Sequence, residues 1–190
     1  MNQVSFTARF GATWEGVSFE SPGTQSTLSH LIVRHASRGS DPILYPAAIA
    51  GLNADLVMDL LDIDASRAPL FFRGGSMILR DSQIDIPLTG DGLNVKQGMA
   101  QTIRCVFTGN DSPDTDAVDY DGVVDGLIQD CQIYNFTGFN SDGIDIGEQC
   151  VNCLLEGNPI LTEVTNGMNQ AIRPREGKNF YRLEIFQLGF

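Results

Sequence analysis

The sequence predicts an all-β protein, a right-handed parallel β-helix of about seven coils. Two observations support this prediction. Short apolar segments recur every 20 to 30 residues or so along the chain, and two separate apolar columns keep the same drifting interval. The composition agrees, because 20 Gly among 190 residues suit a chain with many turns better than one with long helices.

The first column consists of the last residue of a short apolar pattern. This pattern appears clearly four times, in Val57–Ile63, Ile78–Ile84, Leu127–Ile133 and Leu154–Ile160. With two weaker copies, the closing residues are Ile63, Ile84, Phe107, Ile133, Ile160 and Ile185. They are separated by 21, 23, 26, 27 and 25 residues. Short strands repeated at this interval predict a stack of β-coils.

The second column runs in step with the first and consists of Ile49, Leu70, Leu93, Val118, Ile144 and Ile172. Its separations are 21, 23, 25, 26 and 28 residues. Three members lie in short segments of similar sequence, namely Gly90–Val95, Thr115–Tyr120 and Ser141–Ile146. The leucine-rich consensus frame is missing, and so are the amphipathic helices of helical repeats, so a parallel β-helix fits best.

We expect the coils to fill residues 1–161, with each coil burying its inward residues against its neighbours. Residues 162–190 are irregular and hold four of the twelve basic residues, Arg173, Arg175, Lys178 and Arg182. This segment is expected to form either a cap or an imperfect last coil. An open coil exposes strand edges, so a homodimer through that edge is a further expectation.

The charge balance excludes several partners. Twelve basic and 24 acidic residues give a net charge of −12, the opposite of a nucleic-acid-binding surface. No run approaches the roughly 18 apolar residues of a membrane helix, and the N-terminus does not resemble a signal peptide.

Cys105, Cys131, Cys150 and Cys153 are expected to be buried thiols, and the C-x-x-C spacing of the last two leaves their pairing open.

Four segments of the chain resemble a known family. Trp14–Phe19 and Leu28–Val33 are similar to the opening coils of bacterial β-helix domains of the pectate-lyase-like superfamily. Asp114–Gly122 and Gly138–Glu148 resemble a subgroup found in large surface or secreted proteins, beside spore-coat-type kinase or lamin-tail modules. The likeness covers roughly residues 10–160. It implies an extracellular or cell-surface location and, because such proteins continue with more coils, a truncated member.

A narrower likeness concerns Asn140–Gly143, which resembles the Asn-Thr-Asp signature of polygalacturonases of the same fold. Those enzymes also need an Asp-Asp pair one coil on, a Gly-His-Gly and an Arg-x-Lys. Here Asn169 and Gln170 stand one coil after Asp142, and the histidines, His30 and His35, lie in no such motif. A glycoside hydrolase is therefore the weakest hypothesis.

The residues that follow the second apolar column should point outward, because side chains alternate across a strand. This outward column reads Ala50, Phe71, Asn94, Asp119, Asp145 and Arg173. Coils lie about 4.8 Å apart, so stacked carboxylates would repel by roughly 3–4 kcal/mol at an effective dielectric of 20. Calcium would relieve this repulsion, and its expected ligands are Asp116, Asp119, Asp142 and Asp145. The alternative, without a cofactor, is that these aspartates cap turns.

The same face holds the candidate binding and catalytic residues. Asn94, Asp119, Asp145 and Phe71 are expected to contact a ligand, Phe71 by stacking on a sugar ring. Polysaccharide lyases of this fold use Lys or Arg as the base, which makes Lys96 and Arg73 weak catalytic candidates, together with Asp142. The alternative for Lys96 is an ordinary ion pair between coils.

Two functions remain open. The first is a non-catalytic surface module that binds carbohydrate or a partner, or that spaces other domains. The second is a polysaccharide-active enzyme, most simply a lyase acting on an acidic polysaccharide. The sequence contains aspartate pairs and one or two cations on a single face but no complete catalytic set, and we therefore prefer the first function.

Overall fold

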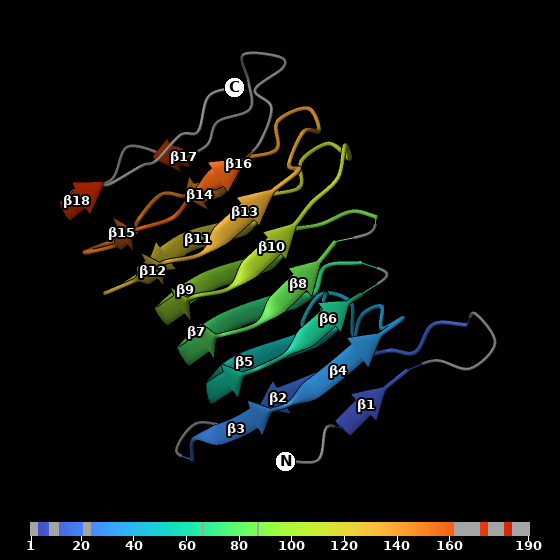
Figure 1. Ribbon diagram of the computed structural model, residues 1–190. Helices are drawn as coiled ribbons and strands as arrows, with labels where there is room; N and C mark the ends of the chain where they lie inside the picture. The colour runs from blue at the N-terminus through green and yellow to red at the C-terminus, as the bar shows by residue number, and fades with distance from the viewer. Residues whose placement is uncertain are drawn as a thin grey trace.

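The chain winds into a parallel β-solenoid of about 6 turns, shown in Figure 1 as a computed structural model. The structure describes residues 4–7, 12–20, 24–65, 67–86 and 88–161, together with two strands at 172–174 and 181–183. Within these residues every regular element is a strand, and none is a helix that could cross a membrane. The predicted all-β fold class is confirmed, and the expected seven coils are close to the number found.

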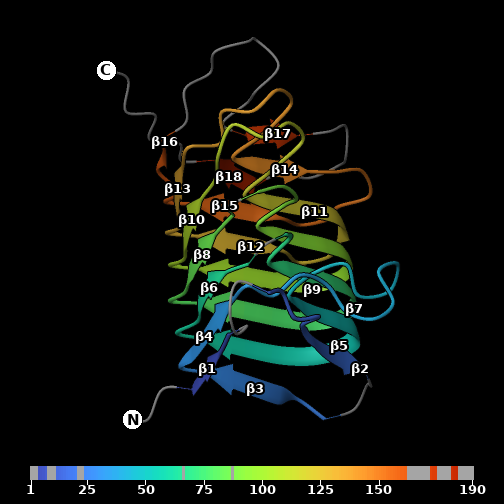
Figure 2. The same ribbon diagram turned by 90° about the vertical axis from the view of Figure 1, so that its right-hand side faces the viewer.

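One side of the solenoid is a seven-stranded parallel sheet (Figure 2). Its strands are separated in the sequence by whole coils, so each pairs with the equivalent strand of the coils before and after it. In order they are β1 (Val4–Phe6), β4 (Leu31–Arg34), β6 (Asp62–Asp64), β8 (Gln83–Asp85), β10 (Val106–Thr108), β13 (Gln132–Tyr134) and β16 (Ile160–Leu161).

The other sheet has three long central strands, β5 (Ile49–Asp59), β7 (Leu70–Arg80) and β9 (Leu93–Ile103). Shorter strands continue their first halves, namely β2 (Val17–Glu20), β11 (Val118–Val123), β14 (Ile144–Ile146) and β17 (Ile172–Pro174). Others continue their second halves, namely β3 (Ser26–Ser29), β12 (Leu127–Gln129), β15 (Leu154–Glu156) and β18 (Tyr181–Leu183). The two halves form two adjoining faces of the coil.

Both predicted apolar columns are present and form the core. In the seven-stranded sheet the stacked, buried residues are Ile63, Ile84, Phe107, Ile133 and Ile160. In the larger sheet they are Ile49, Leu70, Leu93, Val118 and Ile144, with Ile172 next in register. Each fully buried side chain of this size contributes about 1.5–3 kcal/mol. Ile185, the last predicted member of the first column, lies outside the described residues.

A sharp corner joins the larger sheet to the seven-stranded sheet in every coil. One residue per coil takes a positive φ there: His30, Leu60, Asp81, Arg104 and Asp130, with φ between 51° and 56°, and then Gly157 at 66°. The ladder of backbone hydrogen bonds continues through these residues, since Leu60 N–H donates to Arg80 O and Asp81 N–H to Ile103 O. His30 therefore lies at a corner between two strands.

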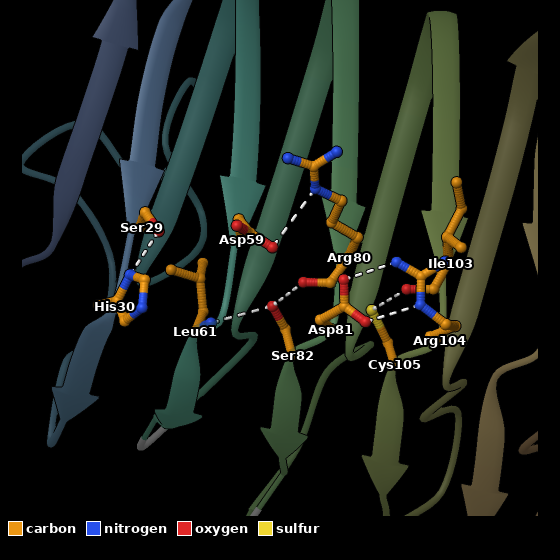
Figure 3. A network of polar contacts seen from close by, with 10 residues as sticks. All are labelled: Ser29, His30, Asp59, Leu61, Arg80, Asp81, Ser82, Ile103, Arg104 and Cys105. Carbon is orange, nitrogen blue, oxygen red and sulfur yellow. Dashed lines mark hydrogen bonds and ion pairs between the residues drawn. The ribbon is translucent and has the colours of Figure 1, made fainter. Parts of the chain in front are cut away.

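A buried column of small and polar residues follows the corner and consists of Ser82, Cys105, Cys131 and Asn158. Figure 3 shows that the Ser82 hydroxyl accepts from Leu61 N–H (3.0 Å) and donates to Arg80 O (2.7 Å). The Cys105 thiol makes the equivalent contact with Ile103 O (3.3 Å). All four cysteines are buried and free, which confirms the expectation of buried thiols.

The C-terminal segment is described only through two strands. β17 pairs in parallel with β14, and β18 pairs with β15 with a shift in register between Leu154 and Leu155. The remainder of residues 162–190, where a cap or an imperfect coil is expected, lies outside the described residues.

Candidate functional site

The predicted outward column exists on the first half of the larger sheet. Asn94, Asp119 and Asp145 are direct neighbours across β9, β11 and β14. Phe71 precedes Asn94 in the column, and Arg173 follows Asp145. Phe71 is only 7% exposed, and the Arg73 guanidinium lies 5.6 Å from the centre of its ring. Little of the Phe71 ring is therefore available to stack on a sugar.

A polar cleft of about 300 Å³ opens over this column. Strand alternation places some of its lining residues, while Asp91, Asp114, Asp116 and Asn140 come from the loops that precede the strands. The lining residues are Asp91, Asn94, Lys96, Asp114, Asp116, Asp119, Asp121, Asn140 and Asp145. We call this surface the acidic cleft.

Three carboxylates converge beside the acidic cleft, and two of them, Asp116 and Asp145, line it. Asp116, Asp142 and Asp145 each offer an oxygen, and these oxygens lie within 4.8 Å of one another. Asp142 and Asp145 are buried, at 0% and 5% exposed. Three carboxylate oxygens at this spacing match the hard oxygen ligands that calcium prefers. Of the four predicted calcium ligands, the structure brings these three together.

The fourth predicted ligand, Asp119, contacts a cation of the chain itself. Lys96 Nζ donates to Asp119 Oδ2 (3.1 Å) and also to Asp121. The amide of Asn94 donates to Asp119 Oδ2 and to Asp91 Oδ2, both at 2.7 Å. The interpretation of Lys96 as an ion pair between coils therefore describes its contacts.

Turn capping also describes part of the carboxylate arrangement. Asp116 N–H donates to Asp91 Oδ1 (3.0 Å), and Asp142 N–H donates to Asp116 Oδ1 (2.5 Å). Each of these carboxylates accepts a backbone hydrogen from the next coil. These hydrogen bonds hold the two carboxylate side chains in position.

Burial shifts the protonation of the acidic cleft. Burial, followed by the charge of Asp91, raises the pKa of Asp116 to about 8. Burial also raises the pKa of Asp119 to about 7, even though the positive charge of Lys96 opposes this shift. For Lys96, burial alone would lower the pKa, but the hydrogen bonds and charges of Asp121 and Asp119 outweigh it and raise the pKa. Near neutral pH the cleft therefore holds protons or favours a bound cation.

Arg73, the other candidate base, lies beside a second, shallower depression of about 500 Å³. The register stacks Arg73, Lys96 and Asp121 in one column, and Glu148 lines the depression as well. Arg73 is exposed, whereas Asp142 is buried in the cluster of three carboxylates. The three catalytic candidates therefore do not converge on one point.

Sequence reasoning did not select Asp91, Asp114, Asp121 and Asn140 as site residues, although all four line the acidic cleft. Asp91 and Asp121 lie in or beside the repeated sequence segments around the outward column, so the repeat could have identified them as neighbours of the site. Asp114 and Asn140 come from loops, where Asn140 Nδ2 donates to Asp114 Oδ1 (2.7 Å). The two residues hold equivalent positions, each four residues before the apolar column at Val118 and Ile144, but strand alternation does not fix the direction of a side chain in a loop.

The described residues thus present an acidic cleft on a parallel β-solenoid. This fold is consistent with a β-helix. Comparison of the chain with protein-family models, with curated proteins and with solved structures finds no match.

Proposed function

We propose that the protein is a non-catalytic β-solenoid module that binds carbohydrate in the acidic cleft through a bound calcium ion. One observation carries the proposal, namely the convergence of Asp116, Asp142 and Asp145, of which Asp116 and Asp145 line this polar cleft and Asp142 is buried behind them. A divalent cation would neutralise carboxylates that the fold holds close together. Calcium accepts six to eight oxygen ligands, so positions remain for water or for sugar hydroxyl groups.

The lining of the acidic cleft supports a sugar as the ligand. Carboxylates accept hydrogen bonds from hydroxyl groups, and the amides of Asn94 and Asn140 can both donate and accept them. The volume of about 300 Å³ lies at the lower end of the range for small-molecule sites, which suits one or two sugar rings. No lining residue in the described part of the chain is aromatic, so hydroxyl contacts would supply the specificity.

A polysaccharide lyase is the alternative, and the exposed Arg73 beside Lys96 is the observation in its favour. Against it, the raised pKa of Lys96 keeps this side chain protonated and unable to act as a base near neutral pH. The six aspartates that line the acidic cleft would also repel an acidic polymer, unless a cation intervened. We therefore prefer binding to catalysis.

The resemblance to bacterial surface proteins supports a location at the cell surface, and we propose that location for the module. Under this proposal the solenoid presents the acidic cleft to extracellular glycans and also spaces it from neighbouring domains. A second copy of the chain at an open coil edge remains a proposed partner.

The proposal is tested by thermal unfolding with millimolar calcium and with chelator. We expect calcium to raise the melting temperature, because a ligand that binds only the native state stabilises it by about 2.7 kcal/mol at one hundred times its dissociation constant. Asp145→Asn should remove most of the shift. Asp111→Asn is the matched control, because Asp111 is exposed and does not line the cleft.

Glycan binding and catalysis are then separated with the same protein. A glycan array probed with calcium and with chelator should show retention only with calcium. Incubation of acidic polysaccharides with the protein should yield no unsaturated products. An identical melting temperature with calcium and chelator contradicts the calcium site, while products that disappear in Arg73→Ala would establish the lyase instead.

A further inference from the structure

Cys150 and Cys153 lie at a double bend in the last fully described coil. The chain takes a positive φ at Gln149 (66°) and again at Asn152 (56°). Between these two residues, Val151 makes a parallel bridge to Val124 in the coil below. The bends turn both cysteines inward, at 4% and 2% exposed, while Gln149, Val151 and Asn152 remain exposed. The two thiols therefore lie on the same side of a single layer of chain.

The contacts of the two thiols place them beside one strand, β11. Cys150 Sγ donates to Tyr120 O (3.1 Å), and Cys153 Sγ lies 3.8 Å from Val123 O. The two thiols interact, which raises the pKa of Cys150 and lowers that of Cys153, and Cys105 and Cys131 are coupled in the same way. A Cβ added at Gly126 would lie 2.8 Å from Cys153 Sγ, so the glycine there leaves room for the sulfur.

The other thiol pair differs in geometry. Cys105 and Cys131 occupy equivalent positions of adjacent coils, since Val106 pairs with Gln132 and Gln132 N–H donates to Cys105 O (2.8 Å). Parallel strands in register hold equivalent residues about 4.8 Å apart with their Cβ atoms side by side. A disulfide needs its Cβ atoms at about 3.5–4.5 Å. Cys150 and Cys153 instead lie in the same coil, three residues apart around the bend at Asn152, so a bond between them would not tie one coil to the next.

We propose that Cys150 and Cys153 are a redox pair that closes into a disulfide when the protein meets a low-molecular-weight disulfide. The Cys153 thiolate attacks one sulfur of the small disulfide, forms a mixed disulfide and releases one small thiol. The Cys150 thiolate then attacks the Cys153 sulfur, forms the Cys150–Cys153 bond and releases the second small thiol. Two protein thiols are oxidised, and one small disulfide is reduced to two thiols.

Access to the thiols requires only a local opening of residues 148–152. Among the described residues, five hydrogen bonds hold this segment to the coil below. Gly122 N–H donates to Glu148 O (3.0 Å), Val151 N–H to Val123 O (2.9 Å) and Asp125 N–H to Val151 O (2.9 Å). Cys150 Sγ donates to Tyr120 O (3.1 Å), and Asn152 Nδ2 donates to Asp125 Oδ1 (3.0 Å). Segments held by few contacts open more readily than the core. The pair would be a dithiol in a reducing compartment and a disulfide in an oxidising one, whether or not the acidic cleft is occupied.

The test uses the full chain, reduced, desalted and incubated with glutathione disulfide at pH 8, then unfolded in acid and alkylated. We expect two of the four thiols to escape alkylation. Trypsin cannot locate the bond, because no Lys or Arg lies between Arg104 and Arg173. Cleavage before aspartate separates the cysteines, with Cys105 in 91–110, Cys131 in 130–141, and Cys150 and Cys153 together in 145–190. The bond should map within the last peptide.

Two single variants add controls. Cys150→Ser should trap a mixed disulfide with glutathione on Cys153, whereas Cys105→Ser should still form the bond in the last peptide. Peptide mapping of the wild type needs neither variant, so a variant that fails to fold leaves the test intact. Four alkylated thiols after oxidation, or a bond that joins Cys105 to Cys131, would overturn the proposal.

Discussion

Asp116 and Asp119 keep protons at a pH where an ordinary aspartate has lost them. Burial raises their pKa values to about 8 and about 7, whereas an unfolded aspartate has a pKa of about 3.9. The native state therefore binds more protons than the unfolded state between these values. The stability that these two protonated carboxyl groups contribute is complete below a pH of about 4 and is lost as the pH rises through about 8.

We therefore predict that the melting temperature in chelator rises when the pH is lowered from 8 to 5, by about 5 °C or more. Circular dichroism melts across this range measure the slope. Asp116→Asn should flatten it, because an amide does not titrate, while Asp111→Asn should leave it unchanged. A wild type that becomes more stable toward pH 8 without calcium would show that other groups dominate the titration.

At the scale of the strands, the buried columns decide stability. Ile144 in β14 is fully buried between Val118 and Ile172 of the neighbouring coils. Removing its side chain leaves a cavity that two stacked coils cannot easily close. We predict that Ile144→Ala lowers the free energy of unfolding by about 2–5 kcal/mol. Gln132→Ala, an exposed substitution on β13, should change the free energy of unfolding by no more than about 0.5 kcal/mol. Urea unfolding curves of both variants measure the difference. Equal effects of the two substitutions would contradict the buried column.

These columns were the part of the fold that the sequence could predict. Every coil must place an apolar residue at the same inward position, so a period remains visible even when loops change its length. The same alternation predicted that Asn94, Asp119 and Asp145 form one column, and the register confirms that they are neighbours, although Asp145 is only 5% exposed. A change of direction inside β9 was not predictable, because the left-handed residues there are Gln97 (φ 69°) and Gly98 (φ 92°), and nothing in the period marks them.

The candidate site was predictable only where strands carry it. Asp114 and Asn140 reach the acidic cleft from loops, where the repeat aligns the two positions but strand alternation does not fix which way their side chains point. The position of Phe71 on its strand also did not reveal that the Arg73 guanidinium lies over its ring. By contrast, Lys96, Asp119 and Asp121 all lie on strands, and the register pairs Asp121 directly with Lys96, so the contacts of Lys96 with both carboxylates follow from the strand pattern.

At the scale of the whole molecule, the first coil has strand edges with a partner on one side only. Among the described strands, β1 pairs with β4 alone, and β2 and β3 pair with β5 alone. Val4 and Phe6 on β1 are 52% and 45% exposed. Such edges favour pairing with another chain, whereas a net charge of −12 opposes the approach of a second copy.

We therefore predict a weak self-association that strengthens with salt, because 1 M salt shortens the screening length to about 3 Å from about 10 Å at 0.1 M. Light scattering over a range of protein concentrations, at low and at high salt, measures the mass. Thr27→Lys, which adds a charge to the exposed edge strand β3, should weaken the dimer about tenfold, because a charged edge disfavours strand pairing. The same substitution at Gln132, on the interior strand β13, should leave the mass unchanged. A single monomeric mass at every concentration and salt level would mean that the first coil does not pair with a second copy, and the dimer proposal would then fail at this edge.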